Sequence, residues 1–193
     1  MPTDSDAPPA DEAALVVAAQ AGDRRAFGRL VEAHWDRLHR WLFHLTRDRH
    51  RAEDLTQETF LKALAALHSF RPGTNFRAWL FRIGHNNFVN LKRAERRPTQ
   101  PLPDDAPARP GPTAEATASD REAVRRVQQA VADLPPDFRA ALLLRAEEGL
   151  SFKEVADVLG TTEETARWRV FKARQRLLNV LSPELLPPGV GDP

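Results

Sequence analysis

The chain of 193 residues contains no cysteine. This absence excludes disulfides, cysteine-ligated zinc, iron–sulfur clusters and thiol catalysis. No apolar run approaches the ~18–20 residues that a membrane-spanning helix needs. The first residues also lack the basic region and apolar stretch of a secretory signal. We therefore expect no membrane insertion and a cytoplasmic location.

A large net charge is missing too. The 28 Lys and Arg residues nearly cancel the 27 Asp and Glu residues, which leaves a formal net charge of +1. This sum argues against a uniformly basic coat for nucleic acid, but it hides how charge is distributed. Residues 71–97 hold seven cations against one acid, a net of +6, and residues 165–176 hold five cations and no acid.

Proline is scarce in two long stretches of the chain. Most of the 16 prolines lie near the two ends and in residues 98–112. Because proline breaks helix interiors, the stretches between are free to be helical. The segment 98–118 has almost no large apolar side chains, so we interpret it as a flexible, proline-rich linker. It separates a first module, residues 10–97, from a second module, residues 119–182.

Both modules are predicted to be all-α, which makes the chain two small helical domains on a linker. Apolar residues recur with the spacing of one helix face, and no segment alternates as a strand does. Asp23 is a candidate N-cap for the first long helix. The expected helices cover residues 26–45, 52–67, 76–91, 121–132 and 135–147.

Two short helices around a glycine predict a helix-turn-helix in the second module. Ser151 and Glu154 match a Ser-x-x-Glu capping box, and the helix that they begin stops at Gly160. Thr161 and Glu164 match a second capping box, which predicts the start of the next helix.

This next helix carries the charge that DNA binding needs. Arg167 and Arg169 have the guanidinium groups that contact guanine edges bidentately. The later cations are suited to phosphates, and they are Lys172, Arg174 and Arg176. The alternative to DNA binding is that this helix only packs within the module and exposes its basic face to solvent. We favour DNA binding because the two capping boxes, the glycine turn and the uninterrupted cations coincide.

In the first module, aromatic and basic residues interleave over residues 71–97. Single-stranded nucleic acid binds such surfaces, because bases stack on rings while phosphates pair with cations. Phe76 and Trp79 have helical spacing, so we favour a core role for these two, and Phe81 and Phe88 stay open. The preceding helix is acidic, which fits a solvated face as well as a binding surface; its acids are Glu53, Asp54 and Glu58.

Two other classes of protein fit the features of the two modules less well. A stand-alone helix-turn-helix regulator explains only the second module, and it predicts tight DNA binding by the free protein, usually as a dimer. An enzyme lacks support, because no glycine-rich phosphate loop or acid–base pair is present. The only histidine cluster comprises His34, His39, His44 and His50. At these spacings the side chains do not lie on one helix face, as metal ligands on a helix would. We therefore expect no metal, no cofactor and no catalysis.

Three motifs resemble the extracytoplasmic-function (ECF) subgroup of bacterial sigma factors. AEDLTQETFLKA, residues 52–63, resembles the helix of sigma factors that binds core RNA polymerase. FRAWLFRI, residues 76–83, followed by Asn86, resembles the promoter-melting segment of the subgroup. TARWRVFKAR, residues 165–174, resembles its recognition helix. The motifs follow the family's order over about 150 residues, with the linker where the family has one.

The resemblance implies a factor that directs bacterial RNA polymerase core to promoter DNA, with an anti-sigma factor as a further partner. Core polymerase binding is expected from Asp54, Gln57 and Glu58. Contacts with the −10 element are expected from Arg77, Arg82, Asn86, Asn87, Asn90, Lys92 and Arg93. Among these, Asn86 is expected to line the pocket for a flipped base. Contacts with the −35 element are expected from Thr165, Arg167, Trp168, Arg169, Lys172 and Arg174.

The chain departs from the family pattern at three positions. Ala166 stands where a larger apolar residue is usual, and Gly84 stands where alanine is usual. A glycine inside a helix is expected to loosen it by roughly 1 kcal/mol. Trp168 replaces a small polar residue on the side that faces DNA, so we expect it to change the −35 preference or to pack against sugar or a thymine methyl.

Overall fold

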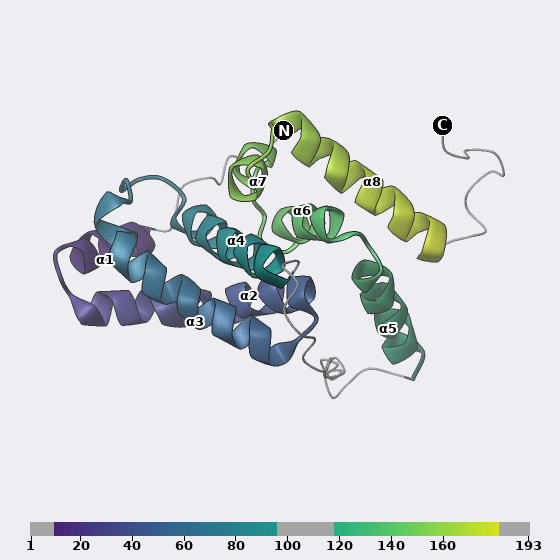
Figure 1. Cartoon of the computed structure of the whole chain (residues 1–193), viewed down its shortest axis with the longest axis horizontal. Helices are drawn as coiled ribbons and strands as arrows, with labels where there is room; N and C mark the ends of the chain where they lie inside the picture. Colours follow the sequence, from purple (N-terminus) through teal and green to yellow (C-terminus); the bar gives the residue numbers. More distant parts are fainter. Residues whose placement is uncertain (1–9, 96–117, 182–193) are drawn as a thin grey trace.

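The computed structural model describes residues 10–95 and 118–181, and both ranges are built from helices (Figure 1). The first module contains α1 (Ala10–Gln20), α2 (Arg24–Thr46), α3 (Arg49–Ala66), the short 3-10 helix η1 (Leu67–Ser69) and α4 (Phe76–Glu95). The second contains α5 (Ala118–Ala132), α6 (Pro136–Ala146), α7 (Phe152–Leu159) and α8 (Glu163–Leu181). These two ranges contain no strand, which confirms the all-α prediction. Almost all of the predicted linker, residues 98–118, lies outside them.

None of the helices in the described ranges is long and apolar enough to cross a membrane.

The long helix α2 organises the first module, because α1, α3 and α4 all pack against it. Its predicted N-cap is confirmed: one carboxylate oxygen of Asp23 accepts hydrogen bonds from the backbone N–H groups of Arg25 and Ala26. Its apolar face is buried as the periodicity predicts, with Leu38 and Leu42 fully enclosed.

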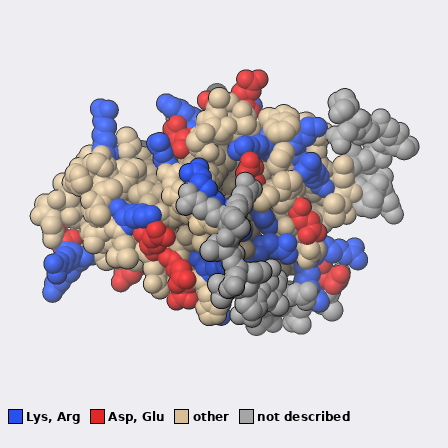
Figure 2. Space-filling model, viewed as in Figure 1, with Lys and Arg blue, Asp and Glu red and all other residues tan. Residues whose placement is uncertain are grey.

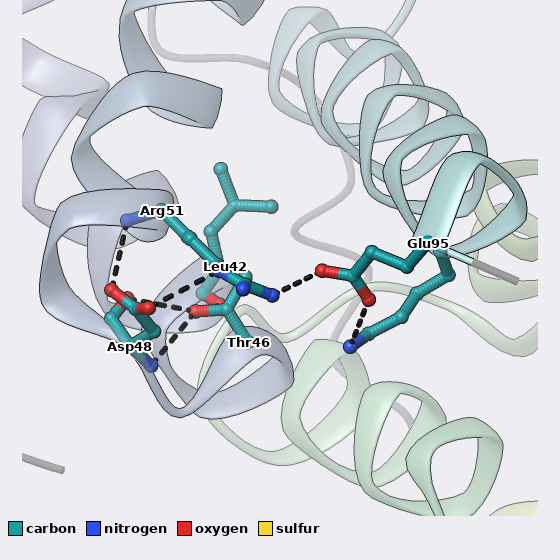
Figure 3. A network of polar contacts seen from close by, with 6 residues as sticks. Leu42, Thr46, Asp48, Arg51 and Glu95 are labelled. Atoms are coloured by element: carbon teal, nitrogen blue, oxygen red, sulfur yellow. Dashed lines mark hydrogen bonds and ion pairs between the residues drawn. The ribbon is translucent and has the colours of Figure 1, made fainter. Parts of the chain in front are cut away.

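A polar network joins the ends of three helices in this module (Figure 3). The carboxylate of Asp48 caps α3 by accepting a hydrogen bond from the backbone N–H of Arg51 at 3.0 Å. The Arg51 side chain then pairs with Asp48 and with Glu95 at the end of α4. Glu95 also binds Lys92 at 2.9 Å. Through these contacts the carboxyl end of α4 is held against the α2–α3 turn.

The aromatic residues of α4 belong to the core of the first module. Phe76, Phe81 and Phe88 are 1%, 0% and 7% exposed. Phe76 contacts the ring of Phe70, and Phe81 contacts that of Trp41. The core role favoured for Phe76 is confirmed. Base stacking by Phe81 or Phe88 is excluded in this structure, because burial leaves these rings no face for a base.

Gly84 marks a close approach of α4 to two other helices. A Cβ atom at this position would lie 3.1 Å from Leu38 Cδ1 on α2 and 3.5 Å from Thr59 Oγ1 on α3. The glycine therefore lets α4 pack closely against its neighbours, which offsets the loss of helix propensity expected from the sequence.

The helix-turn-helix forms as predicted, with one correction. Ser151 and Glu154 form both bonds of the capping box, and Gly160 ends α7 in the left-handed conformation at φ 61°. The second box is wrong by one residue: Thr162, not Thr161, caps α8, because its hydroxyl accepts from Thr165 N at 3.1 Å. The backbone N–H of Thr161 is already used, since it bonds Ala156 O in the C-cap of α7.

Candidate nucleic-acid interface

An exposed face of α3 gathers the residues expected to bind polymerase. Asp54, Gln57 and Glu58 are all exposed, and Figure 2 shows acidic side chains gathered along this helix. Leu61 and Leu64 join the same side and are 69% and 51% exposed. The face is thus acidic with an apolar strip. Leu64 lies outside the core although its spacing fits the apolar side of the helix expected over residues 52–67, and Leu61 is an addition that its exposure identifies.

The expected −10 residues divide between two sides of α4. Arg82, Asn86, Asn90 and Arg93 follow one another at intervals of three or four residues, and all four are exposed. Residues at these intervals share one helix face. This face, which we call the α4 face, combines two amides with two guanidinium groups, and Val89 lies among them at 36% exposure. The arrangement provides amide donors and acceptors for a base edge and cations for phosphates.

Asn87, which was also expected to contact the −10 element, does not belong to the α4 face. It is only 3% exposed and lies between α4 and α3. Its amide nitrogen donates to Thr59 Oγ1 at 3.1 Å, and its oxygen accepts from Lys62 Nζ at 2.6 Å. Both polar ends are therefore occupied within the protein, and the residue holds the two helices together.

Arg77 and Lys92 also lie off the α4 face. Arg77 is half-buried on the side of α4 opposite to Arg82. Its Nε atom is buried without a hydrogen-bond partner. Burial raises the pKa of Glu148 in the second module, and the charge of Arg77 lies near enough to oppose that rise. Lys92 is partly buried and pairs with Glu95. Arg77 is thus partly enclosed between the modules, whereas Lys92 must leave its pair with Glu95 to meet DNA.

The cations of α8 differ in exposure, and two of its arginines are held in ion pairs. Arg167 is exposed, pairs with Glu163 at 2.6 Å and lies 4.6 Å above the ring of Phe152. Arg169 is half-buried and pairs with Asp137 at 3.1 Å. Thr165 and Lys172 are half-buried, and Arg174 is exposed. The exposed pair of Arg167 is worth about 0–1 kcal/mol, so this cation can exchange its partner for a phosphate or a base edge. Arg169, whose side chain is 21% exposed, must first leave a partly enclosed pair.

Two large apolar side chains lie among these cations. Trp168 is 50% exposed and Phe171 is 56% exposed. The indole packs against Phe138 of α6, with ring centroids 5.3 Å apart and planes at 56°. Phe171 was not among the residues expected to meet DNA, although its position one turn from Trp168 and between two cations is visible in the sequence.

The two modules contact each other directly, chiefly through α4 and α7 and also through α2 and α6 (Figure 1). Asn75 accepts a hydrogen bond from Ala78 N at the start of α4, and it donates one to Glu154 Oε1 at 2.6 Å. Glu154 also closes the capping box of α7 with Ser151. A helix start in each module is thus bonded to the other.

A buried carboxylate lies beside this contact. Glu148 is 4% exposed, and its nearest cation is Arg37 of α2 at 3.6 Å. Burial raises the pKa of Glu148 above its ordinary value of 4.5, although Arg37 and Arg77 act in the opposite direction. Burial also lowers the pKa of His85 on α4, which faces Asp137 and Arg169.

We expect Glu148→Gln to be more stable than the wild type at pH 8. A raised pKa means that ionised Glu148 destabilises the folded state, a penalty present at neutral pH and lost as pH falls through the raised pKa toward 4.5. Urea unfolding at several pH values measures the difference, which should shrink toward pH 4.5. The matched control is Asp157→Asn, which removes an exposed carboxylate of α7 in the same module. Lower stability of Glu148→Gln at pH 8 would mean that the pairing with Arg37 outweighs burial.

The histidines do not form a metal site. In the described ranges, no group of three or more histidines and acids is arranged to hold a metal ion. His34 is buried and bonds Glu12 of α1 at 2.8 Å, which accounts for it as a structural residue.

Comparisons with known proteins match both modules. The model of sigma-70 region 2 matches residues 30–98, and that of sigma-70 region 4 matches residues 124–177. The chain is 38% identical to the ECF RNA polymerase sigma factor SigE of Mycolicibacterium smegmatis, over 93% of this chain and 73% of the relative. It is 35% identical to the RNA polymerase sigma-H factor of Pseudomonas aeruginosa, over 89% of this chain and 94% of the relative.

Solved structures agree with this result. The chain is similar to CnrH in its complex with the cytosolic domain of CnrY, with a TM-score of 0.66, 30% identity and coverage of 90% of this chain and 99% of the other. It is also similar to the sigma factor RpoE of Bartonella quintana, solved with the anti-sigma factor NepR, with a TM-score of 0.66, 26% identity and coverage of 82% and 98%.

Proposed function

The chain belongs to the ECF family of RNA polymerase sigma factors, and we propose that its two modules divide the promoter between them. The chain directs RNA polymerase to promoters, so the polymerase and promoter DNA are its partners. Sigma factors are not enzymes, and we assign the chain no reaction of its own. We place its action in the cytoplasm, where bacterial RNA polymerase meets DNA, and we include an anti-sigma factor among its partners, as in the RpoE–NepR complex.

The first module, residues 10–97, binds core polymerase and the −10 element in this proposal. Core binds the α3 face of Asp54, Gln57 and Glu58, with Leu61 as an apolar contact. The α4 face captures the −10 strand, with Asn86 at the flipped base and Arg82, Asn90 and Arg93 beside it. Flipping a base costs a few kcal/mol, which amide hydrogen bonds and phosphate contacts recover.

The second module, residues 119–182, binds the −35 element as duplex through α8, and residues 98–118 link it to the first. In helix-turn-helix proteins the second helix enters the major groove, with its N-terminal residues at base edges. Thr165, Arg167, Trp168 and Arg169 are in this part of α8. Lys172 and Arg174 follow as phosphate contacts.

One observation carries the proposal: a region 2 match and a region 4 match lie on the two modules that separately present the α4 face and the helix-turn-helix. Transcription by core plus this protein on a random promoter library tests it. We expect selected promoters to share two elements, with a gel shift that needs core. Strong, specific binding by the free protein, together with transcripts that share no element, would favour a stand-alone regulator.

The adjacent residues Asn86 and Asn87 provide a matched pair of variants. Asn86→Ala should leave the free energy of unfolding unchanged, because the side chain is exposed. It should weaken promoter melting, because the flipped base loses its proposed amide contact. Asn87→Ala should lower the free energy of unfolding by about 1–3 kcal/mol, because buried Thr59 loses a bond and Lys62 loses another. Urea unfolding and permanganate reactivity of the −10 strand measure the two effects. Equal stability of Asn87→Ala and wild type would contradict its assignment to the core.

A further inference from the structure

Trp168 is aimed away from the core of the helix-turn-helix. It lies two residues from buried Ala166 and two residues from buried Val170, which puts it on the opposite side of α8. Half of the side chain is exposed, whereas tryptophan is normally highly buried. Phe171, three residues further along α8, is 56% exposed, so the two rings form an exposed apolar patch on one side of the helix, and such patches mark binding surfaces.

The indole is held in place by its surroundings. Phe138 of α6 packs against it at 5.3 Å, and the guanidinium of Arg176 lies 4.9 Å from the same phenyl ring. Such tilted aromatic pairs add about 0.5–1.5 kcal/mol beyond the area that they bury. The exposed face of the indole is therefore a fixed apolar surface, and its position does not depend on the ligand.

The charge around this surface identifies the ligand class. Cations precede and follow Trp168 on the same helix, and residues 165–176 contain no acid; they are Arg167, Arg169, Lys172 and Arg174. The acids that pair with the first two, Glu163 and Asp137, lie outside this stretch. An apolar surface beside such cations is complementary to the major groove, where phosphates flank base edges. A sugar and a thymine methyl are the two contacts expected for this indole from the sequence. Sugars line the backbone, whereas Trp168 projects from the part of a recognition helix that meets base edges.

We propose that Trp168 reads a thymine in the −35 element through its C5-methyl group, an inference that rests on the proposed function of α8. The indole offers one N–H donor and no acceptor, so it cannot form the bidentate bonds that select guanine or adenine. Thymine alone presents an apolar group in the major groove. Against the amino group of cytosine, the same ring would desolvate a donor without replacing its hydrogen bond.

Replacing thymine by deoxyuridine tests this proposal without altering the protein. The probe is a promoter duplex selected from the random library by core plus this protein, in which each −35 thymine is replaced singly by deoxyuridine. We expect about fourfold weaker binding at one or two positions, because one methyl group is lost from a buried contact. With Trp168→Ala, the same replacements should cause no further loss.

Leu178→Ala is the matched control, because Leu178 is on the same helix and is 57% exposed. This variant should show the same loss of binding as the wild type at each position where deoxyuridine replaces thymine. Selected promoters with no fixed −35 thymine, or an identical profile for wild type and Trp168→Ala, would overturn the proposal. A Trp168→Ala variant that instead loses only a protein partner would reassign the indole to protein binding. If replacing Arg167 and Arg169 also leaves duplex binding unchanged, the proposed function of α8 itself fails.

Discussion

Replacing Arg167 and Arg169 together by alanine is expected to abolish −35-dependent transcription while association with core polymerase survives. Each good bidentate contact between a guanidinium and guanine contributes about 1–3 kcal/mol of discrimination. Two such contacts amount to about 2–6 kcal/mol, which is a loss of some thirtyfold or more in promoter affinity. In the free protein Arg167 occupies an exposed pair with Glu163, which releases it at little expense, and half-buried Arg169 pairs with the exposed carboxylate of Asp137.

The double variant is compared with Arg125→Ala/Arg126→Ala, which removes the same charge from exposed positions of α5 in the same module. Thermal unfolding shows whether the loss of the Arg167–Phe152 contact, at 4.6 Å, disturbs the module. Transcription from a promoter with and without its −35 element measures the effect. Retained preference for the −35 element in a stable double variant would show that other residues of the chain select it.

Helix ends were the most predictable part of the fold. The capping box of Ser151 and Glu154, the left-handed Gly160 and the N-cap Asp23 each depend on residues within a few positions of one another, so the sequence contains the whole cause. The error at Thr161 has the same local origin. Gly160 leads into a C-cap bond that uses the backbone of Thr161, and the next available threonine becomes the cap.

The division of α4 into two sides was not predictable from the sequence. Asn86 and Asn87 are chemically identical neighbours, yet one is exposed and the other is buried. Which of them faces solvent depends on how α4 is rotated against α3, and the close approach at Gly84 helps to set that rotation. Amphipathic spacing alone leaves such a choice open by one residue, about 100° around the helix.

Contacts between the modules depend on residues far apart in the chain. Asn75 and Glu154 are 79 positions apart, and Glu148 lies near Arg37 and Arg77 of the other module. Each looks like an ordinary capping or surface residue when the sequence is read locally. Their roles in joining the modules arise only after both modules have formed, so no short motif predicts them.

Asp54→Arg is the second variant with a large expected effect, a loss of association with core polymerase. Asp54 is exposed on α3, and within the described ranges it forms no ion pair, so substitution should change stability by no more than about 0.5 kcal/mol. At an interface that receives the acidic face of α3, a reversed charge would oppose a cation of the partner. Like charges placed opposite each other cost several kcal/mol, which is at least a hundredfold in affinity.

A pull-down with core polymerase measures this loss, and Glu32→Arg is its control, because it reverses an exposed acid on α2 of the same module. Glu58→Arg should have a mixed effect, since Glu58 already pairs with Lys62 at 2.6 Å and its replacement also removes that ion pair, leaving the lysine bonded to Asn87. Asp54 is therefore the cleaner probe of the face. Recovery of Asp54→Arg with core at wild-type yield would move the docking surface away from the acids of α3, and the apolar strip of Leu61 and Leu64 would be the next to test.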